Sequence, residues 1–151
     1  MSSAAPRYHL SMAEDKQLTK HFKASEFWCK HCKEQGIKPE FVDLLQEFRD
    51  FIGVPLVITS GYRCKNHPVE ASKKPGSIGR HTLGVAVDLF APSLTLEQLY
   101  SKIEEFGRFQ GVGVSVARKF IHCDTRQGKA RWCYSSTGKT LPWNGEWSSL
   151  D

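Results

Sequence analysis

The segment Ser77-Ile-Gly-Arg-His-Thr-Leu-Gly-Val-Ala-Val-Asp-Leu89 joins a loop to a predicted strand and contains two side chains of the metal-ligand type. Large and small apolar residues alternate from Val85 to Leu89, which predicts a buried strand with Asp88 on the face opposite the valines. A carboxylate placed there must be paired or bind a metal, because an unpaired buried charge is costly. His81 lies shortly upstream and can supply a nitrogen to the same ion. Two ligands do not complete a site.

A second predicted strand, residues 120–124, supplies the third candidate ligand. We expect it to pair with a strand at residues 111–115, and its sequence Phe-Ile-His-Cys-Asp places His122 and Asp124 on one face. Two histidines and one carboxylate suit zinc, because catalytic zinc typically has three protein ligands and keeps a fourth position for water. The sequence therefore predicts a Zn²⁺ site made of His81, Asp88 and His122.

Two further residues are candidates for catalysis. Hydrolysis needs a proton acceptor near the attacking water, and Asp124 is the nearest carboxylate in sequence, so we expect it to be the general base. Its alternative role is to orient His122 from behind. Arg63 follows a short β-rich run, Leu56–Ser60. It forms either a structural salt bridge or a clamp that holds a substrate oxygen as charge develops on it.

Two helices are expected to flank these strands. Apolar residues recur at three-four spacing over residues 39–52, where a proline stands at the first position and Gly53 follows the last. A second helix is predicted from about Thr95 to Phe106, with Ser93 or Thr95 as its cap and Gly107 at its end. Both are interpreted as packing elements.

The cysteines raise a separate question. Five are present, an odd number, which argues against a fully paired disulfide framework. Cys29 and Cys32 have the Cys-x-x-Cys spacing that binds metal, forms a redox pair or closes a small disulfide. A second metal site there needs further ligands, and His31, Cys64 or His67 can contribute only if the fold brings them together. The alternatives of a second metal site, a disulfide and a free-thiol pair stay open.

The length of 151 residues predicts one domain, and the net charge of +5 suits an anionic partner such as nucleic acid, a membrane surface or an acidic cell-wall polymer. We expect a flexible arm at residues 1–18, a catalytic domain at 19–132 and an aromatic tail at 133–151. No stretch has the length of a transmembrane segment or the apolar core of a signal peptide. We therefore expect synthesis in the cytoplasm and no stable membrane insertion, and any action outside the cell would need a means of release other than a leader.

The motifs also resemble a known family. His81-x-x-Gly-x-Ala-x-Asp88, the upstream Ser60-Gly-Tyr-Arg63 and the downstream Phe120-x-His-x-Asp124 are together similar to the zinc D-alanyl-D-alanine carboxypeptidases. The nearest branch by these motifs is the small peptidoglycan (murein) peptidases of bacteria and phages, and the resemblance covers about residues 19–132.

The resemblance implies an α+β fold with a small antiparallel sheet and flanking helices, of the Hedgehog/DD-peptidase-like type. It implies a Zn²⁺-dependent carboxypeptidase or endopeptidase acting on peptidoglycan peptides that contain D-amino acids, as in phage lysis. Such an enzyme would act on the cell wall after release or as part of a virion. The two histidines and Asp88 would be its ligands, and Arg63 would contact the substrate. The chain departs from the family at Gly79, where Ser or Thr is usual, and at Lys119, where some relatives carry an acidic base.

Two other classes of function compete with a monomeric peptidase. One is a non-catalytic peptidoglycan-binding or virion structural protein that retains the fold, which the departures at Gly79 and Lys119 favour. The other is a zinc-ribbon-like nucleic-acid binder, suggested by Cys29-x-x-Cys32 and the positive charge. Only half of a ribbon is present in the sequence, so we expect no nucleic-acid partner.

Overall fold

The computed structural model describes residues 15–68 and 79–150. Most of the predicted arm at residues 1–18 and most of the loop at 64–80 therefore lie outside the described residues. Within the described ranges no helix has the length and apolar character needed to cross a membrane.

Two α-helices form where the apolar spacing predicts them. Helix α2 spans Pro39–Ile52 and ends at Gly53, whose φ of 70° is left-handed. Helix α4 spans Leu96–Phe106; Thr95 is its cap, because the Thr95 side chain accepts the backbone N–H of Gln98. Short 3-10 turns, η1 (Ala24–Phe27) and η2 (Trp147–Ser149), lie near the two ends of the described chain. The predicted boundaries of both α-helices are confirmed.

Six strands form a single sheet in the order β1-β2-β4-β3-β5-β6. Their bounds are β1 Val57–Ser60, β2 Ala86–Phe90, β3 Gly111–Ser115, β4 Phe120–Asp124, β5 Ala130–Tyr134 and β6 Thr140–Pro142. Neighbouring strands are antiparallel except β3 and β5, which are parallel. The predicted small antiparallel sheet is therefore confirmed for four of the five strand pairs, and the parallel pair of β3 and β5 departs from it. After β4 the chain passes the end of β3 and adds β5 on its far side, in the same direction as β3.

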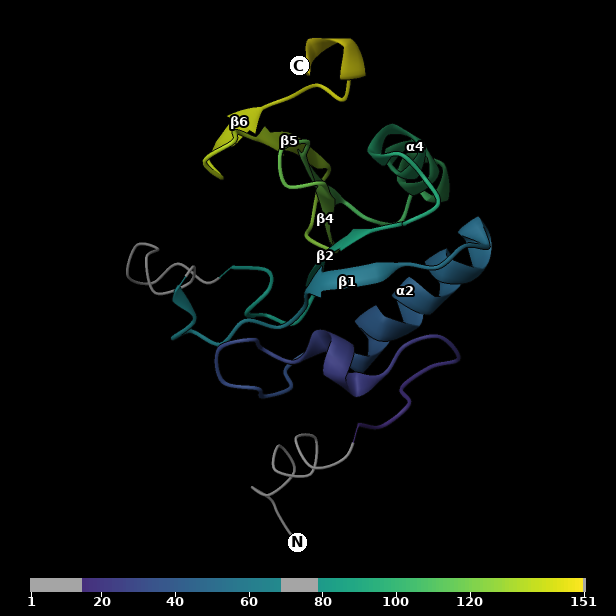
Figure 1. The fold of residues 1–151 in the computed structure, drawn as a ribbon, viewed down its shortest axis with the longest axis vertical. Coiled ribbons are helices and arrows are strands. Elements are labelled where there is room, and N and C mark those ends of the chain that lie inside the picture. Colours follow the sequence, from purple (N-terminus) through teal and green to yellow (C-terminus); the bar gives the residue numbers. More distant parts are fainter. Residues whose placement is uncertain (1–14, 69–78, 151) are drawn as a thin grey trace, which may run out of the picture.

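The two faces of this sheet carry different side chains. Both helices lie on one side of it in Figure 1, and the core side chains of the strands, such as Val87, Val112, Ile121 and Cys123, are fully buried in a cluster with apolar residues of α2 and α4. The intervening residues project to the other side. We call that side of the sheet the cavity face, after the cavity described below. The predicted ligands lie on this face.

The described ends of the chain are tied to this body. Asp15 accepts hydrogen bonds from the backbone N–H and hydroxyl of Ser25. The expected boundary between residues 132 and 133 lies inside β5, and Trp143 of the following segment belongs to the buried core.

Candidate functional site

The three predicted ligands lie together on the cavity face, although they come from three segments. Asp88 of β2 and His122 of β4 are direct partners in an antiparallel pair, so their side chains emerge next to each other. His81 reaches the same place from the turn that precedes β2. All three side chains are buried, with exposed fractions of 4–5%.

The distances between their ligand atoms fit a tetrahedral zinc ion. His81 Nε2 lies 3.2 Å from Asp88 Oδ1 and 3.2 Å from His122 Nδ1, and these last two atoms lie 3.1 Å apart. Nitrogen and oxygen ligands bound tetrahedrally to zinc are separated by ~3.3 Å, given metal–ligand bonds of about 2.0–2.2 Å. The spacing of the donor atoms therefore fits the ion.

Outer hydrogen bonds set the protonation of both imidazoles. His81 Nδ1 lies 2.7 Å from the carbonyl oxygen of Gly61, and His122 Nε2 lies 2.7 Å from Asp124 Oδ2. Each of these nitrogens must donate, since its partner only accepts. The other nitrogen of each ring is then a lone-pair acceptor that faces Asp88. Three acceptor atoms converge with no donor between them, and a cation stabilises such an arrangement.

Asp124 lies immediately behind His122 and is fully buried. Arg126 donates to it through Nη2 at 2.7 Å and Nε at 2.9 Å, and through its backbone N–H at 3.0 Å. Both carboxylate oxygens are therefore engaged. A Cβ at position 111 would lie 2.2 Å from Asp124 Oδ1, so Gly111 leaves the space that this carboxylate occupies. These contacts favour the orienting role of Asp124 over that of a base.

The pKa shifts in the site indicate an ionised Asp88 beside two histidines that differ in how readily they bind a proton. Burial would raise the pKa of Asp88, but His81 and His122 outweigh it and hold that pKa well below its usual range. Burial lowers the pKa of His81 in spite of Asp88. For His122 burial also acts downward, yet the hydrogen bonds to Asp124 and Asp88 outweigh it, so its pKa is raised. Asp88 is thus a carboxylate at any working pH, as a metal ligand must be.

Arg63 lies beside the ligand set. Its Nη2 is 3.1 Å from Asp88 Oδ2, the oxygen that does not face the histidines, and its Nε donates to the Ser60 hydroxyl at 3.2 Å. The same guanidinium lines the cavity described next. Arg63 therefore forms a salt bridge with a buried carboxylate and also lines the cavity, and its role as a substrate clamp stays a prediction.

A cavity of about 720 Å³ opens over the three ligands. Among the described residues that line it are four arginines, at positions 63, 80, 118 and 126, but a single carboxylate, Asp88. Trp132 forms part of the wall; the Arg126 guanidinium lies 4.6 Å from its ring centroid, and the ring of His122 lies 5.2 Å away. The cavity is thus positively charged and partly aromatic, which suits a ligand with carboxylate groups.

Several lining residues were not recognised from the sequence as parts of the site, among them Arg126, Trp132 and Tyr134. Burial raises the pKa of Tyr134 to about 12, so its hydroxyl stays protonated and acts as a donor. The period-two spacing of Asp124 and Arg126, and of Trp132 and Tyr134, is the sequence signal that places each pair on one face.

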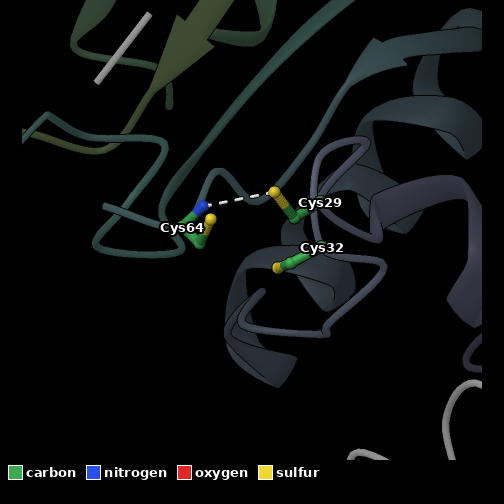
Figure 2. Close-up of side chains that lie close together, drawn as sticks. All are labelled: Cys29, Cys32 and Cys64. Atoms are coloured by element: carbon green, nitrogen blue, oxygen red, sulfur yellow. Dashed lines mark hydrogen bonds between the residues drawn. The ribbon is translucent and has the colours of Figure 1, made fainter. Parts of the chain in front are cut away.

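The cysteine motif forms a separate cluster. Cys29 and Cys32 meet Cys64, and the three sulfur atoms lie within 4.8 Å of one another (Figure 2). All five cysteines have free thiols in the structure. Of the partners considered for a second metal site, Cys64 and His31 are brought close to the pair, and the His67 ring lies 6.3 Å from that of His31.

Three converging, buried ligand side chains beneath an arginine-lined cavity define a candidate metallohydrolase centre. A family model for peptidase M15 matches residues 20–124, and the chain belongs to this family of zinc-dependent peptidases. The match covers every residue predicted for the site. A comparison with curated proteins finds no match. The resemblance seen in the sequence motifs is confirmed at the level of the family.

Proposed function

We propose that this chain is a zinc metallopeptidase that hydrolyses peptide bonds of peptidoglycan stem peptides or cross-links containing D-amino acids. The observation that carries the proposal is the convergence of His81 Nε2, Asp88 Oδ1 and His122 Nδ1 at 3.1–3.2 Å beneath the cavity. These three residues would hold Zn²⁺. When bound, the ion would activate water and polarise the scissile carbonyl. We place the fold with the Hedgehog/DD-peptidase-like zinc peptidases and the activity in cell-wall degradation, as in phage lysis or tail-associated entry.

The surrounding side chains have separable tasks in this proposal. Asp124 keeps the proton of His122 on Nε2, so that Nδ1 presents its lone pair. The Gly61 carbonyl does the same for His81. Arg63 fixes the outer oxygen of Asp88 and holds the substrate oxygen on which negative charge develops.

The charge of the cavity supports a peptide with free carboxylates as the substrate. Stem peptides of peptidoglycan carry such groups, and guanidinium side chains bind carboxylates with paired hydrogen bonds. Replacing Arg80 and Arg118 with Gln should raise KM and weaken its dependence on salt, with little change in kcat. Arg108→Gln is the matched control, because Arg108 is more than half exposed and is not part of the lining. An equal effect of all three substitutions would contradict this assignment of the substrate.

Purified sacculi provide the direct test of the peptidase. The zinc-loaded protein should release peptides with new termini, identified by mass spectrometry, and those termini decide between a carboxypeptidase and an endopeptidase. Chelation and His81→Ala should each abolish release, and added zinc should restore only the chelated parent. A protein that holds zinc at His81 yet cleaves no murein chemotype would overturn the proposal.

A second candidate function is a non-catalytic protein that binds peptidoglycan through the same cavity. The observation that favours it is that Asp88 is the one carboxylate among the described residues of the cavity lining, and Asp88 already belongs to the ligand set. No separate general base is thus provided by that part of the lining. Co-sedimentation with sacculi without any released peptide would select this function.

A further inference from the structure

Three cysteines and a histidine gather away from the peptidase site. Cys29 and Cys32 lie in the loop that follows η1, and Cys64 lies beyond the end of β1; their side chains point toward a common space in Figure 2. Their sulfur atoms lie within 4.8 Å of one another. Thiolates bound to one tetrahedral zinc ion are ~3.8 Å apart, given zinc–sulfur bonds of about 2.3 Å. Small side-chain adjustments would therefore bring all three into bonding distance.

The loop that carries the first two cysteines is closed tightly. The backbone N–H of Lys33 donates to the carbonyl of Cys29 at 2.7 Å, and the N–H of Cys29 donates to the carbonyl of Glu34 at 2.8 Å. Lys33 has a φ of 64°, a left-handed conformation that non-glycine residues seldom adopt. The chain accepts this strained turn, and the turn places both sulfur atoms on one side of the loop.

A backbone donor is aimed at the sulfur of Cys29, because the N–H of Cys64 lies 3.3 Å from it. An N–H group directed at a sulfur stabilises the thiolate, which is the form of cysteine that binds metals. This hydrogen bond also joins the segment after β1 to the loop after η1 at the sulfur cluster.

A fourth ligand is at hand. His31 Nδ1 lies 3.7 Å from Cys64 Sγ, and a nitrogen and a sulfur bound to one tetrahedral zinc are separated by ~3.6 Å. A disulfide would use two of the three sulfurs and leave the third without a role. A three-thiolate, one-imidazole set uses all of them and is a common structural zinc site.

We propose that Cys29, Cys32 and Cys64, with His31, form a second zinc site, whose role is structural. It would join the loop after η1 to the segment after β1. Two residues of that segment contact ligands of the peptidase centre. Gly61 accepts the hydrogen bond of His81 Nδ1. Arg63, which adjoins Cys64 in the chain, pairs with Asp88. Closed zinc sites of this kind contribute folding free energy directly. The site would therefore brace the peptidase centre without taking part in its chemistry.

Metal analysis of the reduced, purified protein tests the second site independently of peptidase activity. We expect two zinc ions per chain in the parent, one in His81→Ala and one in Cys64→Ser. Cys133→Ser is the matched control, because Cys133 has the same 8% exposure as Cys64 but lies in β5, and it should keep both ions. A parent with one zinc and a His81→Ala variant with none would overturn the proposal.

A spectroscopic readout covers the case in which Cys64→Ser fails to fold. His81→Ala loaded with Co²⁺ should show intense near-ultraviolet absorption from thiolate-to-cobalt charge transfer, and chelation should remove that absorption and lower the thermal midpoint. Adding His31→Ala should weaken cobalt binding at least tenfold, whereas adding His67→Ala should not. Absence of the charge-transfer band, or a Cys29–Cys32 disulfide in the non-reduced parent, would contradict a metal site.

Discussion

At the scale of single residues, the site depends on which nitrogen of each imidazole carries the proton. Asp124 decides this for His122, because its buried carboxylate lies 2.7 Å from Nε2 and is itself held by Arg126. The carboxylate is ionised in the fold: burial opposes ionisation, but His122 and Arg126 together hold the pKa of Asp124 below its usual range. In the proposed zinc site, Asp124 would therefore act on the ion through His122.

Asp124→Asn separates this orienting role from that of a general base. The amide keeps the size of the side chain but no longer requires a proton on His122 Nε2. We expect zinc affinity to fall 10- to 100-fold, the range found when the outer partner of a metal-binding histidine is lost. Competition with a chromophoric chelator measures the affinity. A variant that binds zinc like the parent but has lost hydrolysis would instead identify Asp124 as the base.

Some residues of the site can be placed from the local sequence pattern, whereas others depend on contacts between segments that are distant in the chain. Asp88 and His122 could be placed on one face because period-two alternation in two short strands fixes which face a side chain takes, and His81 was added from its position shortly upstream. Trp132 could not be placed, because its position depends on β5 lying next to β3, a contact between distant segments. The sequence could not decide the state of Cys29 and Cys32 for the same reason, since only the fold shows that Cys64 approaches them.

At the scale of elements, helices α2 and α4 follow from local signals, namely apolar spacing and capping residues. The parallel pairing of β3 with β5 has no comparable signal. An ion pair secures it instead: Arg131 of β5 donates to Glu104 of α4 at 2.6 and 2.9 Å and to the carbonyl of Gln110 at 2.7 Å. The second helix is thereby linked to the strand that carries Trp132.

Glu104→Gln should show how much this link stabilises the fold. The hydrogen bonds from Arg131 lower the pKa of Glu104 to about 2 from a usual 4.5. Because the folded pKa is depressed, the stabilisation is present above pH 4.5 and is lost as pH falls toward 2. We expect the variant to lose about 1–2 kcal/mol in the free energy of unfolding at neutral pH, and the difference to shrink with acid.

Urea denaturation at a series of pH values measures this difference. Glu105→Gln is the control, since Glu105 is 61% exposed and its carboxylate lies 3.4 Å from the ammonium group of the exposed Lys102. It should leave the free energy of unfolding nearly unchanged at every pH. A loss in Glu104→Gln that stays constant with pH would assign the stabilisation to packing and neutral hydrogen bonding rather than to the charge.

At the scale of the whole molecule, the family match ends at Asp124 but the sheet does not. Residues 130–134 extend it beyond β3, and residues 140–142 add a further strand. Trp132 and Tyr134 complete the cavity wall, and Arg126 holds Asp124. The segment after the matched region therefore belongs to both the core and the site, and we propose that the catalytic domain extends through it.

Two truncations test this extension. A chain ending at Thr125 lacks β5 and β6, so the edge of β3 is unpaired and Asp124 loses its arginine; exposed strand edges also promote aggregation. We expect no cooperative thermal unfolding and no zinc at His81. A chain ending at Asn144 keeps both strands and the buried Trp143, and it loses the contact of Trp147 with Tyr100. It should unfold cooperatively at a slightly lower temperature and retain zinc. Cooperative unfolding of the shorter chain, followed by circular dichroism, would show that the matched region folds alone and that the last strands are an addition to it.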